Sequence, residues 1–311
     1  MVTIIPYCAD KKEEWNTFLR TAKNAHFMFH RDYMEYHSNI FKDMSLMIYD
    51  DATLIGLVPG NIADQVFYTH QGLTFGGVIS NEKMKVPKML SIFKHIFHFL
   101  RKQGIQKVIY KAIPYIYHRY PAQEDLYALH YFQSKLYRVD VSSTIDLRHP
   151  LKISDRRKRG IKKALKNGIE IKETRDFRTY IEILNIILEK KYKTSATHTA
   201  DELIFLNEKF PDHIRLFCAY DQEKMLAGVV IYETDTVAHA QYIAASDEGK
   251  LCGALDAVFD YLIHKVYSHK QYFDFGVSTE NQGKYLNEGL IQQKEEFGSR
   301  AIVHQFWEVN L

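Results

Sequence analysis

The feature that most constrains the fold of this 311-residue chain is that one order of predicted elements occurs twice. Apolar spacing and turn residues predict, in each half, a strand, two helices, three antiparallel strands, a helix, a strand, a helix and a final strand. The first series runs from 2–5 to 137–147, and the second runs from 169–173 to 301–307. Sheets flanked by helices satisfy this order, so we expect a duplicated α/β architecture.

The strongest local signals lie in the second half. Helices are predicted over 176–191 and 199–209, strands over 214–220, 225–233 and 237–245, and a further helix over 253–269. Asp176 is a plausible N-cap of the first of these helices. We expect domains at 1–148 and 149–311, joined by a basic helix over 154–167.

Composition and termini exclude several classes of protein. The three cysteines, Cys8, Cys218 and Cys252, are far apart and indicate neither a zinc site nor a disulfide framework. His26 and His30 have a ligand-like spacing but no evident third ligand, so no metal site is expected. The start of the chain does not resemble a signal peptide, and no apolar run approaches the roughly 20 residues of a membrane helix. We expect a cytoplasmic protein without an integral membrane segment, and leave peripheral membrane contact open.

Positive charge is concentrated in one segment. Residues 152–166 contain eight basic residues and one acid, a net charge of +7 in a chain whose total is +3. On a helix Arg156, Arg159 and Lys163 share one face, which suits phosphate, diphosphate or an RNA backbone. The alternative is a solvated helix face without a ligand.

Polar residues follow a predicted strand at 272–275, where a site commonly forms. Asp274, Ser278, Glu280 and Asn281 offer hydrogen-bond acceptors to a hydroxylated or amino-bearing substrate. Local turn bonding and capping would explain them equally well. Further along, Lys294 could lie against a phosphate or a developing oxyanion, or be a surface lysine paired with a neighbouring glutamate.

Two glycine-bearing loops are further candidates. One loop lies at the start of the helix predicted over 253–269, and the free N–H groups of that helix could hold a pyrophosphate. The candidate residues there are Gly249, Lys250, Gly253 and Ala254. In the first half, His70 and Gln71 stand before a glycine-containing stretch at 72–77 that allows close backbone approach to a ligand. His70 is a candidate acid or base, although a structural histidine is the more common case.

Four segments together resemble the Fem-type transferases that build peptidoglycan cross-bridges, within the GNAT superfamily. They are Gly-Leu-Thr-Phe-Gly-Gly at 72–77, the basic segment at 156–168, Phe-Asp-Phe-Gly at 273–276 with Ser278 and Glu280, and Lys-Glu-Glu-Phe-Gly at 294–298. The resemblance implies two tandem GNAT-like domains, each a mixed, mainly antiparallel twisted sheet flanked by helices. It also implies that the second domain carries the donor and acceptor site.

The activity that the resemblance implies is transfer of an acyl or aminoacyl group onto an amine. The acceptor would be an amino sugar or peptide amine of cell-envelope polysaccharide or peptidoglycan assembly. Three anionic donors stay open, namely acyl-CoA, an acyl carrier protein thioester and aminoacyl-tRNA, each a co-substrate rather than a tightly bound cofactor. By the same analogy, Lys294 would lie near phosphates and the basic segment would contact the anionic partner.

The expected chemistry is direct attack of the amine on the carbonyl of the donor. Glu280 or Asp274 would take the proton of the amine, and Tyr242 or Tyr285 would protonate the leaving group. Two other classes remain as alternatives. One is a nucleic-acid-binding protein that uses the basic helix. The other is a catalytically silent scaffold with a duplicated fold.

Overall fold

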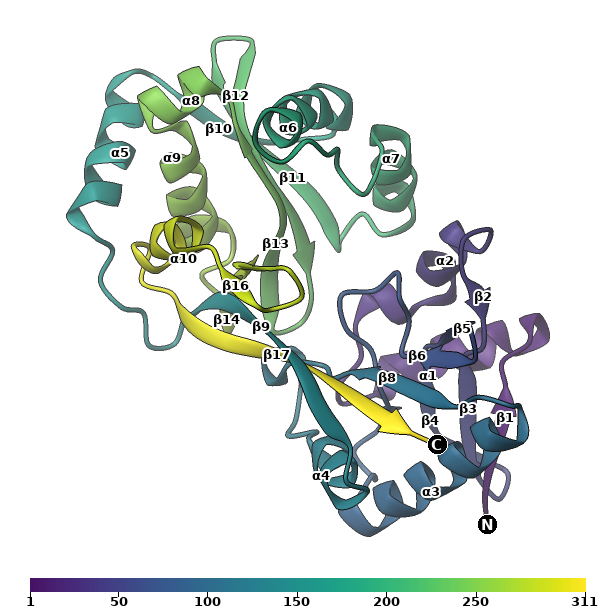
Figure 1. Cartoon of the computed structure of the whole chain (residues 1–311). Coiled ribbons are helices and arrows are strands. Elements are labelled where there is room, and N and C mark those ends of the chain that lie inside the picture. The colour runs from purple at the N-terminus through teal and green to yellow at the C-terminus, as the bar shows by residue number, and fades with distance from the viewer. The chain divides into compact units, whose positions relative to one another are not determined.

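The computed structural model describes the backbone of residues 1–311 and every side chain except those of His37 and Tyr192. The chain forms two compact units (Figure 1). The first contains Met1–Val141, Asn281–Tyr285 and Val303–Leu311, and the second contains Ser142–Glu280 and Leu286–Ile302. The sequence placed all of 149–311 in the second half, whereas the structure returns the end of the chain to the first unit.

The first unit contains two sets of paired strands. Strands β1 (Val2–Pro6), β3 (Leu46–Asp50), β4 (Thr53–Val58) and β7 (Ile79–Ser80) pair antiparallel in that order. In the other set β8 (Lys107–Lys111) lies between the end of β17 (Arg300–Asn310) and β6 (Val66–Tyr68), and then come β5 (Asn61–Ala63) and β2 (Lys42–Asp43). The helices are α1 (Lys12–Thr21), α2 (Arg31–Met34), α3 (Val86–Lys102) and α4 (Glu124–Tyr131).

The second unit is built on one twisted sheet. Its strands follow the order β10 (Glu170–Thr174), β11 (Ile214–Asp221), β12 (Lys224–Glu233), β13 (Val237–Ala245), β14 (Tyr272–Val277) and the latter part of β9 (Lys135–Asp146). All neighbours in this order are antiparallel except β13 and β14, which are parallel. The fold class expected from the sequence is confirmed.

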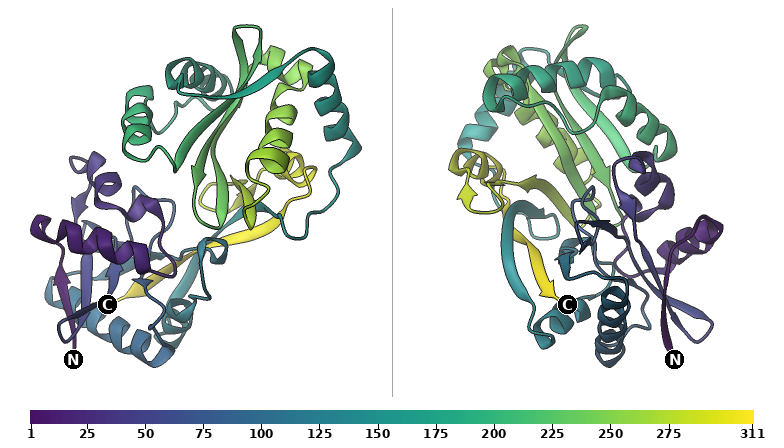
Figure 2. Two further views of the ribbon diagram at one scale, coloured as in Figure 1. Left: turned by 180° about the vertical axis from the view of Figure 1, so that it is seen from behind. Right: turned by 45° about the vertical axis from the view of Figure 1, so that its right-hand side comes forward.

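Helices cover both faces of this sheet (Figures 1 and 2). On one face lie α6 (Phe177–Tyr192) and α7 (Ala200–Lys209), and on the other lie α5 (Asp155–Lys166), α8 (Asp247–Cys252) and α9 (Ala254–Tyr261). The last helix is α10 (Glu288–Glu295). Strands β11 and β12 read as nearly continuous apolar runs because both of their faces are buried.

One predicted helix differs from the structure at its ends. The helix expected over 253–269 is present as α9, which Gly253 separates from α8, and a π-helical turn at Leu262–Val266 follows it. Helix α4 stops at Tyr131, shortly before Gln133 adopts a left-handed conformation. Helix α10 begins at Glu288, because the Asn287 side chain accepts a hydrogen bond from the Leu290 N–H and caps it there.

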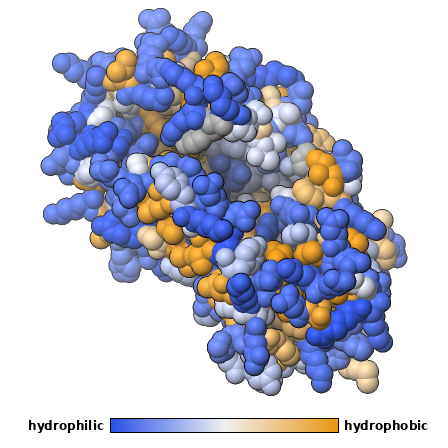
Figure 3. Space-filling model, viewed as in Figure 1, coloured by the Kyte–Doolittle hydropathy of each residue, from blue (hydrophilic) through white to orange (hydrophobic). Residues whose placement is uncertain are grey.

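No helix of the described residues is both long enough and apolar enough to cross a membrane. The face shown in Figure 3 is largely hydrophilic, with apolar residues in scattered groups.

Close packing of α5 against α9 depends on two glycines. A Cβ atom at Gly253 would lie 2.3 Å from the carbonyl oxygen of Gly160, and a Cβ at Gly160 would lie 1.9 Å from Oδ2 of Asp256. Gly253 also has a φ of +80°, a conformation that L-residues seldom adopt. Both the backbone conformation and the helix contact therefore require glycine at position 253.

We expect Gly253→Ala to lower the free energy of unfolding by about 3 kcal/mol, from about 1 kcal/mol of backbone strain plus the cost of separating two backbones. Gly104→Ala is the matched control, because Gly104 has a φ of +76° but nothing within 4 Å of a Cβ atom. It should show the backbone contribution alone. Chemical denaturation of both variants measures the difference, and equal losses would show that the α5–α9 contact tolerates a methyl group.

Candidate active site

The pairing of β13 with β14 ends early. Their parallel ladder covers only Val237–His239 against Tyr272–Asp274, although β13 continues to Ala245. On its other edge β13 stays paired with β12, with a bulge at Gln241, because Val230 lies opposite Tyr242 and Ile231 lies opposite Ala240. Bulges of this kind often lie beside active sites, where they redirect side chains. The point at which the ladder ends is the position of the candidate site.

A buried carboxylate occupies this point. The Asp274 side chain is completely inaccessible to solvent. Its Oδ1 accepts hydrogen bonds from Ser142 Oγ at 2.6 Å and Thr144 Oγ1 at 2.7 Å, and its Oδ2 lies 2.7 Å from Nδ1 of His239. Burial of a carboxylate is costly unless such donors offset the lost hydration. Strands β9 and β13 supply these donors to the carboxylate on β14, so the pairing of three strands creates the cluster.

The hydrogen bond to Asp274 determines which nitrogen of His239 carries a proton. An ionised carboxylate only accepts hydrogen bonds, so Nδ1 of His239 donates, and in the neutral ring Nε2 then carries the lone pair. The ring is 12% exposed, which leaves it within reach of a substrate. A neutral imidazole oriented by a buried carboxylate is the arrangement of a general base.

Gly276 keeps one edge of this ring uncovered. A Cβ atom at position 276 would lie 3.3 Å from Cε1 and 4.0 Å from Nε2 of His239. The residue has a φ of +77°, so the turn after Asp274 also favours glycine. The glycine therefore leaves space on the side of the ring where Nε2 lies.

Lys294 holds the same turn from α10. Its side chain is buried, and Nζ donates to the carbonyl oxygens of Gly276 and Val277, each at 2.8 Å. Burial lowers the pKa of Lys294 to about 8, against an opposing effect of the negative charge of Asp274. Two of the three N–H groups of the ammonium are used for the turn, so at most one can contact a phosphate or an oxyanion.

Tyr242 lies past the bulge on β13 and is bonded to a histidine. Its hydroxyl is 2.5 Å from Nδ1 of His198, a buried residue just before α7. Burial raises the pKa of Tyr242, so the phenol stays protonated at neutral pH. The sequence singled out Tyr242 but gave no sign of its partner.

The other polar residues of the loop have different surroundings. Glu280 accepts a hydrogen bond from Nδ2 of Asn287 at 2.7 Å, and Ser278 is buried with no hydrogen-bond partner for its Oγ among the described residues. Asn281 has a φ of +49°, as expected for a turn residue. Tyr285 is 54% exposed. The structure thus places Asp274 against His239 and Lys294 against the turn at Gly276, and Glu280 bonds to the cap of α10.

The basic helix is α5, and its cations divide into two groups. Arg157 is buried and forms ion pairs of 2.7 Å with Asp256 and with Glu296. Arg156, Arg159 and Lys163, the residues selected from the sequence, are exposed. Arg156 also lies 3.6 Å from Glu296, and the function of the exposed face stays a prediction.

The glycine loop expected to hold a pyrophosphate is explained by packing. A Cβ at Gly249 would lie 2.4 Å from the carbonyl oxygen of Leu226, and the Gly249 N–H already donates to Ser246 Oγ. Gly253 contacts Gly160 as described above. Lys250 pairs with Asp247 at 2.8 Å, and Ala254 is buried. These contacts account for the glycines without a nucleotide.

His70 and Gln71 belong to the first unit. His70 is 4% exposed, and burial lowers its pKa to about 4, which keeps it neutral at pH 7. Its φ is +66°, and its Nδ1 has no hydrogen-bond partner among the described residues. The side chain and N–H of Gln71 bond to Asn61. No group of three or more metal-ligating side chains occurs within the described part of the chain.

Comparisons with known proteins identify the fold. No family model matches the chain, and no curated protein matches it. Among solved structures, FemX is 10% identical with a TM-score of 0.69, over 99% of this chain and 97% of that one. L-PGS from Bacillus licheniformis is 14% identical with a TM-score of 0.65, over 98% of this chain and 92% of that one. A tandem GNAT protein from the clavulanic acid biosynthesis pathway is 11% identical with a TM-score of 0.53, over 100% of this chain and 98% of that one. The chain therefore has the Fem-type double-GNAT fold expected from its motifs.

The lowered pKa of Lys294 predicts a specific pH dependence. Between about pH 8 and the ordinary lysine value of 10.5, the unfolded chain binds more protons at this residue than the folded chain. The free energy of unfolding of the native protein should therefore rise across this range relative to that of Lys294→Met. Chemical denaturation of both proteins at about pH 7.5 and about pH 10, roughly the two ends of this range, measures the change in the free energy of unfolding. A constant difference between the two proteins would show that the lysine titrates normally.

Proposed function

We propose that the chain is an acyl- or aminoacyltransferase that acts on an amine, with its reacting centre beside His239 in the second unit. The observation that carries the proposal is the His239–Asp274 pair at the point where β13 and β14 cease to pair. The Fem-type fold adds support, since FemX and L-PGS share it. A fold alone hosts many activities, so the argument rests on the site.

In the proposed reaction, the amine nitrogen bonds to the carbonyl carbon of the donor, and the C–S bond of a thioester or the C–O bond of an aminoacyl ester breaks. His239 Nε2 takes the proton that the nitrogen loses. Asp274 is a positioning residue, because it is buried and acts by orienting the ring and stabilising its charged form. In this proposal His239 has the role of proton acceptor that the sequence analysis gave to Glu280 or Asp274.

The leaving group also needs a proton. Tyr242 lies on β13 beyond the bulge and keeps its phenol proton at neutral pH, so it can donate to the leaving sulfur or oxygen. Solvent then returns a proton to Tyr242, and His239 releases the one that it took. The backbone at the bulge and the remaining N–H of Lys294 are candidate donors to the tetrahedral oxyanion.

Donor and acceptor are proposed by class. The exposed cations of α5 suit an anionic donor, either acyl-CoA, an acyl carrier protein thioester or aminoacyl-tRNA. An amino sugar or peptide amine of the cell envelope is the proposed acceptor, by analogy with the Fem-type fold. The same exposed cations would serve a nucleic-acid-binding protein, which requires no reaction.

We expect purified protein to transfer a group from one of the three donors to an amine, as detected by mass spectrometry of the product. His239→Asn should lower turnover by about 10²- to 10⁴-fold, the usual contribution of a general base. Asp274→Asn should lower it by a similar factor, because an amide stabilises the other tautomer of the ring. His264→Asn is the matched control, since that histidine is exposed on the π-helical turn.

Two results would contradict the proposal. Full turnover in folded His239→Asn protein would remove the histidine from the mechanism. Absence of transfer from all three donors, together with tight and strongly salt-dependent RNA binding, would favour the nucleic-acid-binding alternative.

A further inference from the structure

Helices α3 and α4 form one surface of the first unit. They pack against each other and lie side by side in Figure 1. Their contact includes Phe97 of α3 and Phe132 at the end of α4, whose ring centroids are 5.4 Å apart. Neither helix contributes to the candidate active site. The side chains that the two helices expose to solvent are called the α3–α4 face below.

The exposed charges of α3 are all positive. Its sequence contains no acidic residue, and Lys94, Arg101 and Lys102 are exposed. Lys94 lies three residues before Phe97 and Arg101 lies four after it, so both flank this ring on the side of the helix that meets α4. None of the three cations has an ion pair among the residues that the structure describes.

The acidic residues of α4 do not compensate this charge, because both are engaged in the interior. Glu124 is paired with the buried Lys23. Asp125 is buried and accepts a hydrogen bond from the Tyr110 hydroxyl at 2.6 Å. The α3–α4 face therefore presents positive charge that the acids of its own helices leave unbalanced.

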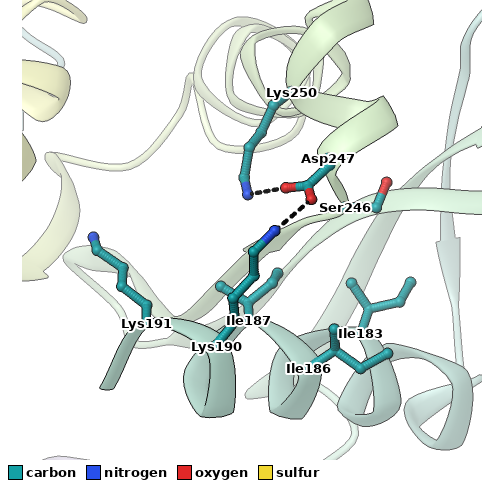
Figure 4. A pocket seen from close by; sticks show the side chains of 8 residues that line it. All are labelled: Ile183, Ile186, Ile187, Lys190, Lys191, Ser246, Asp247 and Lys250. Atoms are coloured by element: carbon teal, nitrogen blue, oxygen red, sulfur yellow. Dashed lines mark hydrogen bonds and ion pairs between the residues drawn. The ribbon is translucent and has the colours of Figure 1, made fainter. Parts of the chain in front are cut away.

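The pocket between α6 and the start of α8 in the second unit shows the contrasting case (Figure 4). There Nζ of Lys190 and Nζ of Lys250 lie 2.9 Å and 2.8 Å from the same Asp247 carboxylate, which balances part of their charge. The three cations of α3 lack a carboxylate of this kind within the described residues, so they can attract an anionic partner from outside the chain.

Two tyrosine rings occupy positions where a solvent-facing helix normally carries charges. Tyr127 is 49% exposed and Tyr131 is 58% exposed on α4, and their ring centroids are 6.3 Å apart. Tyr131 also contacts Phe132, whose ring meets Phe97 of α3. This series of ring contacts brings the exposed tyrosines close to the cations of α3. Just after α4, at the start of β9, Leu136 is 42% exposed.

An anionic lipid surface matches this combination of side chains. Tyrosine is enriched at membrane–water interfaces, because its ring is apolar and its hydroxyl stays in contact with water. Lysine and arginine close to anionic head groups each strengthen binding about fivefold. Acyl chains can cover an aliphatic side chain such as that of Leu136, whereas an RNA backbone offers it little apolar surface.

We propose that the α3–α4 face docks the protein on an anionic lipid bilayer. Lys94, Arg101 and Lys102 contact the head-group phosphates, and the rings of Tyr127 and Tyr131 lie at the level of the head groups. The contact is peripheral. The inference concerns docking alone and does not depend on the proposed transferase activity.

Sedimentation with lipid vesicles tests the docking. The full chain should bind vesicles of equal parts phosphatidylglycerol and phosphatidylcholine about 100-fold more tightly than vesicles of phosphatidylcholine alone, the product of about fivefold for each of three cations. Added salt should weaken this binding, because ions screen exposed charges.

Two variants of equal charge locate the contact. Lys94→Gln/Arg101→Gln should weaken binding to the mixed vesicles by about 25-fold, about fivefold for each cation. Lys162→Gln/Lys166→Gln is the matched control, since it removes two exposed cations from α5 of the second unit. The control should bind the mixed vesicles as tightly as the native protein.

The tyrosines give an independent readout. Tyr127→Ser/Tyr131→Ser should weaken binding to the mixed vesicles by about tenfold, because two half-exposed rings lose their apolar contact. In Tyr131→Trp, lipids with brominated acyl chains should quench the new fluorophore. Phe205→Trp, at a 43% exposed position on α7, is the control. Trp15 and Trp307 are present in both proteins and cancel in the comparison.

The proposal is overturned if the mixed vesicles do not bind, if the α5 variant loses as much affinity as the α3 variant, or if Tyr131→Trp is quenched no more than Phe205→Trp. RNA binding or self-association through the same side chains, without vesicle binding, would assign the face to another occupant and overturn it as well. Circular dichroism of each variant confirms that any loss occurs in folded protein. Since the substituted side chains are exposed, we expect all of these variants to fold.

Discussion

The buried carboxylate of Asp274 is the interaction on which the architecture of the second unit depends. Two hydroxyl groups from β9 and a ring nitrogen from β13 converge on this one side chain of β14. A buried charge without these donors would be strongly destabilising, so the three strands must be in register before the carboxylate can be tolerated. The same requirement fixes the ring of His239. Order in the sheet and order at the candidate site therefore have a common origin.

The structure also explains why the site forms where the sheet is least regular. The end of the β13–β14 ladder, the bulge at Gln241 and the turn at Gly276 lie within a few residues of one another along two neighbouring strands. Each interrupts regular hydrogen bonding, and together they leave space and backbone groups next to the His239 ring. Lys294 secures the turn from outside the sheet, with two hydrogen bonds to the carbonyl oxygens of Gly276 and Val277.

Much of the fold could be predicted from the sequence, because it is determined by local patterns. The strand at Val237–Ala245 was predicted with its observed bounds, and Asp176 caps α6 as expected, with its side chain accepting from the Thr179 N–H. The candidate site depends on contacts between distant residues and was predicted only in part. Asp274 and Lys294 were recognised, but His239 lies in an apolar strand, and its partner is 35 residues away. Likewise, the sequence shows Arg157 only as one of several cations, and its selection for burial depends on Asp256 of α9 and on Glu296 at the C-cap of α10.

The division of the chain between its units has a consequence for biosynthesis. Strand β8 of the first unit pairs with the end of β17, and β17 follows the whole second unit in the sequence. On the ribosome, the first unit is therefore made early but must wait for its last strand until the second unit has emerged. During that interval the edge of β8 is without its native partner, and exposed edges of this kind promote aggregation. A fragment that ends near residue 148 would keep this exposed edge permanently, so the two halves cannot be separated by a single cut without leaving the first unit incomplete.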